Sequence, residues 1–274
     1  MSEQVLSNWR PQYMTATEAY PIASREEHIV PLLKRSFTCA VVVRHDALHM
    51  DASRISILQD AELADKYWYD ESEERQRRSS GKVVHSNYVS EKDIKDEAIS
   101  ANIRLNDMDA SLFTDKCNAI RDLFIRIYYQ YTIDRPFEAM RGFTLFTPQG
   151  GQGRSPELHI DNTILSIHWA AAFATFRVYD GILSDETWNM LSMIERKKKT
   201  QQVQHEDFLK LVKLAKTLPM IENKIGDLMI TKGQLGEDLS DPFVRQQVCV
   251  HVSSPSITQY GQVGFLMTPQ MPKP

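Results

Sequence analysis

The pattern of hydrophobic and polar positions changes period near residue 140, and this change divides the chain into two halves. Before it, the clearest signal lies at 109–131, where apolar side chains recur three, four and seven residues apart. That spacing is typical of an amphipathic helix. After it, residues 141–147 form an extended run of apolar and β-branched positions, which indicates a strand. We therefore predict a mainly helical region over 1–139, packed on a strand-rich core over 140–274.

The second half contains further strands and one helical insertion. Residues 160–179 supply one or two apolar strands, and short strands are expected at 227–232, 246–253 and 262–268. Residues 184–218 carry helical spacing and end at a proline, which stops a helix. Short strands separated by glycine and proline, after a helical half, indicate an α+β fold whose jelly-roll core is buttressed by helices.

Two elements are predicted in the first half. Residues 36–43 are a β-branched run bounded by charge, which indicates a buried strand. Residues 53–69 place Ile55, Leu58 and Leu63 at inward positions of a helix. We predict a strand for the first segment and a helix for the second.

Composition is that of a soluble globular protein and excludes several classes of function. The chain is 42% hydrophobic and 25% charged, with a net charge of −4, so no basic field directs it to nucleic acid or anionic lipid. The longest strongly apolar stretch, 167–176, is too short to span a bilayer. The three cysteines, at 39, 117 and 249, are widely spaced, which argues against a disulfide framework and is typical of a protein in a reducing compartment. We expect a cytoplasmic protein whose partner is a small-molecule or peptide substrate; the oligomeric state has no signal in the sequence.

The candidate chemistry lies in residues 157–163. Side chains two apart in a strand share a face, so His159 and Asp161 are expected to project together. They supply two of the three ligands of the 2-His-1-carboxylate triad that holds Fe(II) with open positions. His251, between two valines in a downstream strand, is the candidate third ligand; the alternative is a hydrogen-bonded core histidine. We interpret His168, in the apolar run, as a core or supporting histidine.

At these residues the sequence resembles a known family. The order His159-x-Asp161, a Gly226-Asp227 strand start and then His251 is similar to that of the Fe(II)/2-oxoglutarate-dependent dioxygenase superfamily. The resemblance covers residues 140–269 and implies a double-stranded β-helix, another name for a jelly roll. It further implies Fe(II) held by His159, Asp161 and His251, with 2-oxoglutarate as cosubstrate for hydroxylation or a related oxidation.

The sequence departs from the family at the residue that anchors 2-oxoglutarate. The family usually carries Arg or Lys shortly after the distal histidine, whereas 252–272 contains neither. A carboxylate prefers a planar cation in a bidentate fork. The candidates are Arg177 as first choice, Arg141 as second, and Arg245, with Thr258 as a hydroxyl donor. Two other interpretations stay open: a cupin-like metalloenzyme that needs no 2-oxoglutarate, and a non-catalytic jelly-roll binding protein.

Overall fold

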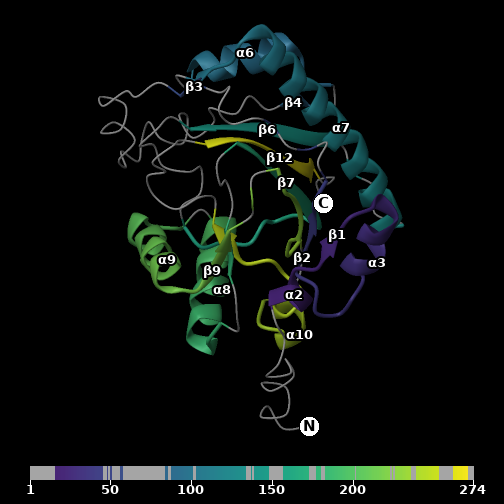
Figure 1. Ribbon diagram of the computed structural model, residues 1–274. Coiled ribbons are helices and arrows are strands. Elements are labelled where there is room, and N and C mark those ends of the chain that lie inside the picture. Colours follow the sequence, from purple (N-terminus) through teal and green to yellow (C-terminus); the bar gives the residue numbers. More distant parts are fainter. Residues whose placement is uncertain are drawn as a thin grey trace.

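The protein has an α+β fold in which helices cover two packed sheets (Figure 1). It is seen in a computed structural model that describes residues 16–45, 48, 50, 56–57, 84–85, 88–100, 103–133, 137, 139–147, 157–172, 177–179, 183–200, 202–222, 224, 226–235, 239–252 and 262–270. No helix in these residues is both long enough and apolar enough to cross a membrane.

Seven strands form the larger sheet, in the order β1-β2-β10-β7-β12-β6-β4. Their bounds are β1 (Ile22–Ala23), β2 (Ala40–Val43), β4 (Val84–His85), β6 (Ala139–Thr147), β7 (Leu165–Ala172), β10 (Leu228–Lys232) and β12 (Gln262–Gln270). Neighbouring strands are antiparallel except for β1 and β2, which are parallel. The antiparallel strands predicted at 141–147, 227–232 and 262–268 are confirmed.

Two smaller sheets complete the β structure. The first has the order β11-β8-β9 and is antiparallel; its strands are β8 (Arg177–Tyr179), β9 (Met220–Glu222) and β11 (His251–Val252). The second pairs β3 (Ser56–Ile57) with β5 (Ile103–Arg104). The helix predicted for 53–69 is therefore wrong at 56–57, because pairing with a distant strand overrides the local helical spacing. The rest of that prediction lies outside the described residues.

The helices of the described residues fall into two groups. Those from the first half are α2 (Ala16–Ala19), the 3₁₀ helix η1 (Glu26–His28), α3 (Ile29–Leu33), α6 (Glu91–Ser100) and α7 (Asp107–Tyr131); those from the second half are α8 (Asp185–Lys199), α9 (His205–Thr217) and α10 (Pro242–Arg245). The helices predicted at 109–131 and 184–218 are confirmed, the latter as α8 and α9. A mainly helical first half is not confirmed, because β1, β2 and β4 join the larger sheet.

One face of the larger sheet packs against α3, α6 and α7. Phe113 of α7 stacks on Trp169 of β7 with ring centroids 5.3 Å apart, and both side chains are fully buried. The odd-numbered residues of β7 and β12 belong to this cluster. Their even-numbered neighbours therefore face the other side of the sheet.

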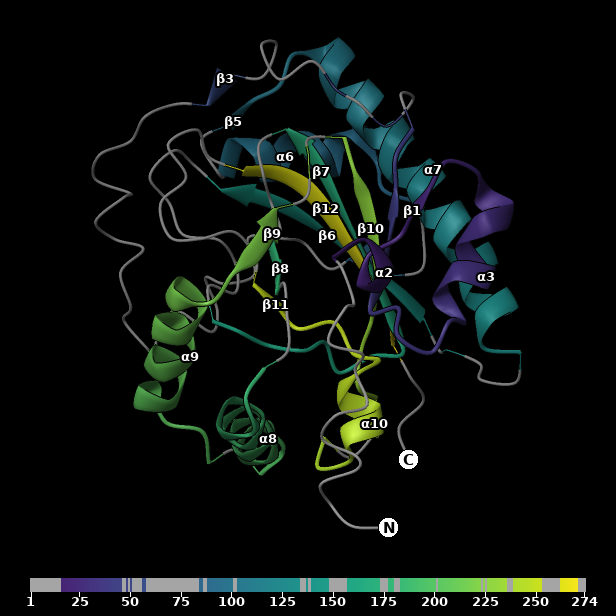
Figure 2. The ribbon, with the colours of Figure 1, turned by 60° about the horizontal axis from the view of Figure 1, so that its bottom comes forward.

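The other face of the larger sheet packs against the sheet of β8, β9 and β11. Val42 of β2 and Met229 of β10 meet Val178 of β8 and Cys249 in one buried cluster. The far side of the smaller sheet is covered by α8 and α9, which pack on Tyr179 and other side chains (Figure 2). The molecule thus has two facing sheets with a helical layer outside each.

The turn before β10 joins three strands. Gly226 has a φ of 82°, which favours glycine, and its N–H donates to Ala170 O at 2.7 Å. Asp227 accepts a bidentate pair from Arg44, which follows β2, with Nε–Oδ1 2.9 Å and Nη2–Oδ2 3.0 Å. The Asp227 side chain is only 3% exposed, so this carboxylate depends on its partners for charge compensation.

We expect Asp227→Asn to lower the free energy of unfolding by about 2 kcal/mol, because it removes the charge from a buried bidentate pair. The matched control is Glu26→Gln, since Glu26 forms an equally bidentate pair with Arg126. That pair is exposed, at 44% for Glu26 and 53% for Arg126, and its loss should cost less than about 1 kcal/mol. Urea unfolding of the three proteins measures the difference; equal losses would contradict this account of the turn.

Candidate metal centre

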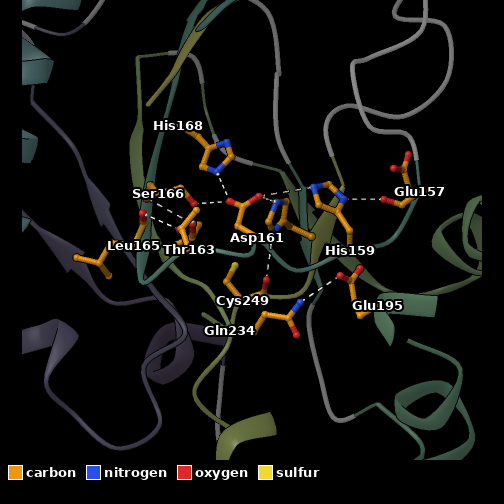
Figure 3. Close-up of polar contacts among 12 residues, drawn as sticks. Glu157, His159, Asp161, Thr163, Leu165, Ser166, His168, Glu195, Gln234 and Cys249 are labelled. Carbon is orange, nitrogen blue, oxygen red and sulfur yellow. Dashed lines mark hydrogen bonds and ion pairs between the residues drawn. The ribbon is translucent and has the colours of Figure 1, made fainter. Parts of the chain in front are cut away.

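His159, Asp161 and His251 come together between the two sheets. His159 and His251 form an antiparallel bridge, in which each backbone N–H donates to the other residue's carbonyl, at 2.9 and 3.0 Å. Asp161 lies between this bridge and the start of β7. Its Oδ1 is 3.6 Å from His251 Nε2 and 3.9 Å from His159 Nε2. Figure 3 shows Asp161 between His159 on one side and Ser166 and His168 on the other. One ligand atom from each of the three residues lies within 4.8 Å of the other two.

The backbone fixes the orientation of both imidazoles. His159 Nδ1 is 2.8 Å from Glu157 O, and His251 Nδ1 is 3.0 Å from Cys249 O. A carbonyl oxygen only accepts, so each Nδ1 carries the proton and donates it. The lone pair is then on Nε2, which is the tautomer that binds a metal. In each case the acceptor is the carbonyl two residues earlier, so the local chain sets the ring.

The two oxygens of Asp161 have different surroundings. Oδ1 faces the two histidines, whereas Oδ2 accepts a short hydrogen bond from Ser166 Oγ and lies 3.3 Å from His168 Nε2. Ser166 Oγ is also 2.8 Å from Thr231 Oγ1 of β10. Side chains of the larger sheet therefore hold one oxygen of the carboxylate and leave the other directed at His159 and His251.

Hydrogen bonds of the backbone fix the segment that carries Asp161. Gln234 N donates to Asp161 O at 2.9 Å, and Gly233 N donates to Ile164 O at 3.1 Å. A side chain at Gly233 has no room, because a Cβ there would lie 2.2 Å from Thr163 O and 2.5 Å from Asp161 O. The backbone at the end of β10 thus fixes residues 161–164, the segment that carries Asp161.

The electrostatics leave the donor atoms ready for a cation. Burial raises the pKa of the Asp161 carboxyl, but the interaction with His251 and the hydrogen bond from His168 outweigh it and hold that pKa well below its usual value. Burial lowers the pKa of His168, so this ring is neutral at pH 7 and supports Asp161 as an N–H donor. Burial also raises the pKa of the Cys249 thiol well above its usual value, and Cys249 is not among the donors that converge with His159, Asp161 and His251 in the described residues.

This donor set fits a divalent transition metal. Two neutral imidazole nitrogens and one carboxylate oxygen converge, both imidazoles have their second nitrogen fixed, and the carboxylate has its second oxygen held. Such a 2-His-1-carboxylate set suits non-haem Fe(II) and leaves coordination positions open. His168 supports the site through Asp161, as its place in the apolar run indicated.

The candidate anchors for 2-oxoglutarate lie in different places. Arg177 begins β8 and Arg141 lies in β6, and both side chains are half-buried. Arg245 ends α10, where it donates to Leu239 O and pairs with Asp185 at 3.3 Å, away from the three ligands. Thr258 lies outside the described residues. The roles of Arg177, Arg141 and Thr258 stay predictions.

Sequence reasoning missed Ser166 as a part of the site. The apolar run 165–170 contains two buried polar residues, His168 and Ser166. A buried hydroxyl needs a partner, and its position five residues after Asp161 was the available signal. The partner itself depends on the bend at 162–164, which has no clear pattern in the sequence.

Comparison with known proteins finds similarity at the level of structure alone. No family model and no curated protein matches the sequence. The dioxygenase for auxin oxidation from rice is similar at 12% identity, over 90% of this chain and 79% of that chain, with a TM-score of 0.41. Dioxygenase for auxin oxidation 1 from Arabidopsis thaliana, bound to 2-oxoglutarate, is similar at 10% identity over 90% and 88%, with a TM-score of 0.38.

A third similar structure is the Kdo hydroxylase, described as a non-haem Fe(II) α-ketoglutarate-dependent dioxygenase, in complex with succinate and Fe(III). It shows 10% identity over 92% of this chain and 89% of that chain, with a TM-score of 0.41. At these TM-scores the likeness carries no argument about function, which has to come from the site itself.

We expect Ser166→Ala to weaken metal binding by about tenfold to a hundredfold, because partners that orient metal ligands contribute on that scale. Co(II) titration of metal-free protein, followed by visible absorption, measures the affinity. Ser192→Ala is the matched control, since Ser192 Oγ in α8 is buried and has no hydrogen-bond partner among the described residues. Equal affinities in all three proteins would show that Ser166 does not orient Asp161.

Proposed function

We propose that this protein is a non-haem Fe(II) oxygenase that uses 2-oxoglutarate to hydroxylate, or otherwise oxidise, a small-molecule or peptide substrate. The observation that carries the proposal is the convergence of His159 Nε2, His251 Nε2 and Asp161 Oδ1. Both histidines donate an Nδ1–H to a backbone carbonyl, and one oxygen of Asp161 accepts from Ser166. The three ligands are therefore oriented before a metal binds.

The fold supports this proposal, because its two facing sheets fit a double-stranded β-helix. Two mainly antiparallel sheets face each other, and the candidate ligands lie between them. Jelly rolls hold ligands and metals in this interior. Helices α8 and α9, which follow β8, cover the smaller sheet from outside, and we assign the chain before residue 139 to the support of the larger sheet.

The residues of the site have distinct tasks in the proposed reaction. His159, Asp161 and His251 would hold Fe(II), which together with 2-oxoglutarate supplies the oxidation chemistry when bound. Ser166 and His168 keep Asp161 oriented, so that the carboxylate presents one oxygen only. His251 is 1% and Asp161 16% exposed, so the site is largely shielded from water, which strengthens its electrostatic interactions.

The strand register favours Arg141 as the anchor of the 2-oxoglutarate carboxylate. Arg141 of β6 is directly opposite Thr268 of β12, and Leu266 of β12 is directly opposite His168 of β7. Opposite residues share a face, as do residues two apart on one strand. Arg141 therefore lies on the same face as His168, two strands away, at about 4.8 Å per strand.

The register disfavours Arg177 for the same role. Val178 points into the cluster between the two sheets, whereas Tyr179 and Val252 belong to the cluster under α8 and α9. Arg177 is opposite Val252 and two residues from Tyr179. It therefore shares their outer face, although the sequence had suggested it as first choice.

We expect Arg141→Met to weaken 2-oxoglutarate binding by roughly 2–5 kcal/mol, because it leaves a buried carboxylate without its cation. Arg177→Met is the matched control and should leave binding within about 0.5 kcal/mol of wild type. Anaerobic titration of 2-oxoglutarate into Fe(II)-loaded protein measures both. A loss confined to Arg177→Met would reverse the assignment of the two arginines.

The activity itself is tested by the fate of the cosubstrate. Fe(II)-loaded protein should convert 2-oxoglutarate to succinate slowly in air even without its substrate, and Asp161→Ala should abolish this conversion. Metal binding without any 2-oxoglutarate binding or turnover would instead support the metalloenzyme that needs no 2-oxoglutarate. Absence of both metal binding and turnover would support the non-catalytic binding protein.

A further inference from the structure

A groove of about 660 Å³ opens on the side of β10 that faces away from the metal centre. Thr231 directs its hydroxyl to Ser166 beside Asp161, so the next residue, Lys232, points to the opposite face. The groove is lined by the ends of α3 and α7, by the end of β10 and by α10. In Figure 1, α3 and the end of α7 are at the right and α10 is at the bottom. Its volume is that of a small-molecule site.

Lys232 is a buried cation in the wall of this groove. It is 5% exposed, and its Nζ donates one hydrogen bond, to Arg35 O at 3.3 Å. An ammonium group has three donors, and Lys232 makes no ion pair with a carboxylate in the described part of the chain. Burial lowers the pKa of Lys232 to about 8, although the neighbouring Cys39 acts to raise it.

The rest of the groove wall combines apolar and polar surface in similar measure. Leu33, Ile164 and Val248 contribute to its wall, and Ile133 and Phe243 lie at 76% and 50% exposure. Among the described lining residues the charged side chains are Lys232 and Lys34, and none is acidic. The groove thus combines a buried ammonium group with a set of apolar side chains and has no acidic residue among those described in its lining.

We propose that this groove binds a small carboxylate with an apolar body, whose carboxylate pairs with Lys232. The apolar body would cover side chains that are now exposed, which favours binding. The carboxylate would compensate the buried charge of the Lys232 ammonium group and accept hydrogen bonds from its remaining N–H donors, because a buried charge needs such partners.

The groove is linked to the metal centre by the backbone. Gly233 and Leu235 line the groove, and they donate to Ile164 O and Thr163 O, both at 3.1 Å, on the segment that carries Asp161. Lys232 O accepts from Cys249 N at 2.8 Å, two residues before His251. A ligand that stabilises 232–235 should therefore also stabilise the metal site, and this second part rests on the proposed function.

Octanoate and 1-octanol are suitable probes, because they share a chain length and differ in charge. Calorimetric titration of metal-free wild-type protein should show octanoate binding. Lys232→Met should weaken octanoate binding by about tenfold to a hundredfold, the scale of a charge-assisted hydrogen bond, and should leave 1-octanol binding unchanged. Lys213→Met, on the exposed side of α9, is the matched control and should bind both probes as wild type does.

Proton uptake gives a measurement that does not depend on a variant. At about pH 8.5 part of Lys232 is neutral, because its pKa is about 8. A carboxylate partner favours the ammonium form and raises that pKa, so octanoate should bind with net proton uptake, seen as a dependence of the heat on buffer ionisation. If Lys232→Met does not fold, this result on wild type decides.

The proposal is overturned if wild type does not bind octanoate, if binding takes up no proton at this pH, or if Lys232→Met binds octanoate unchanged. The link to the metal centre is measured separately, as the Co(II) affinity with and without octanoate, where we expect a gain of about fivefold or more. Octanoate binding to a protein that binds no Co(II) would sink the proposed function and leave the groove site intact. Equal Co(II) affinities would remove the link alone.

Discussion

The backbone bridge between His159 and His251 is the interaction on which the candidate site depends. Two hydrogen bonds, at 2.9 and 3.0 Å, hold together residues that are far apart in the sequence. They bring the ring centroids to 4.2 Å, and the carbonyls of Glu157 and Cys249 then set the ring orientations. Without the bridge, each histidine would be an ordinary side chain at a strand end.

The remaining parts of the fold hold Asp161 against this bridge. The larger sheet supplies Ser166 and His168 on one side of the carboxylate, and the end of β10 supports its backbone from behind through Gly233 and Gln234. Gln234 Nε2 also donates to Glu195 Oε2 of α8 at 3.2 Å, so the same segment contacts the helical insertion. The site is therefore built from both facing sheets and contacts the helical insertion, which explains why its residues are spread over 157–251.

The sequence predicted what depends on local spacing. The helical stripe at 109–131, the strands at 141–147, 227–232 and 262–268 and the two-residue spacing of His159 and Asp161 all lead to the observed elements or convergence. The strand expected at 246–253 is present only as His251–Val252 in the described residues. The reason given for that spacing was incomplete, because Asp161 lies beyond the bridge rather than within a strand. A bend at 162–164, and not strand alternation alone, directs the carboxylate.

Features that depend on pairing between distant segments were beyond sequence reasoning. Residues 56–57 pair with β5 despite their helical spacing, and β2 enters the larger sheet beside β10. The choice between Arg177 and Arg141 likewise depends on the face that each presents, and the face of a three-residue strand cannot be read without its register. The same holds for Lys232, whose burial follows from the packing of α3, α7 and α10 around the end of β10.

The most direct test of the central claim is an anaerobic crystal structure of the protein loaded with Fe(II), with anomalous data collected at the iron absorption edge. We expect one iron per chain, at about 2 Å from His159 Nε2, His251 Nε2 and one oxygen of Asp161, with Ser166 and His168 still on the other oxygen. The central claim would be contradicted by the absence of iron between these residues, or by an iron bound through Cys249 or His168 in place of one of them.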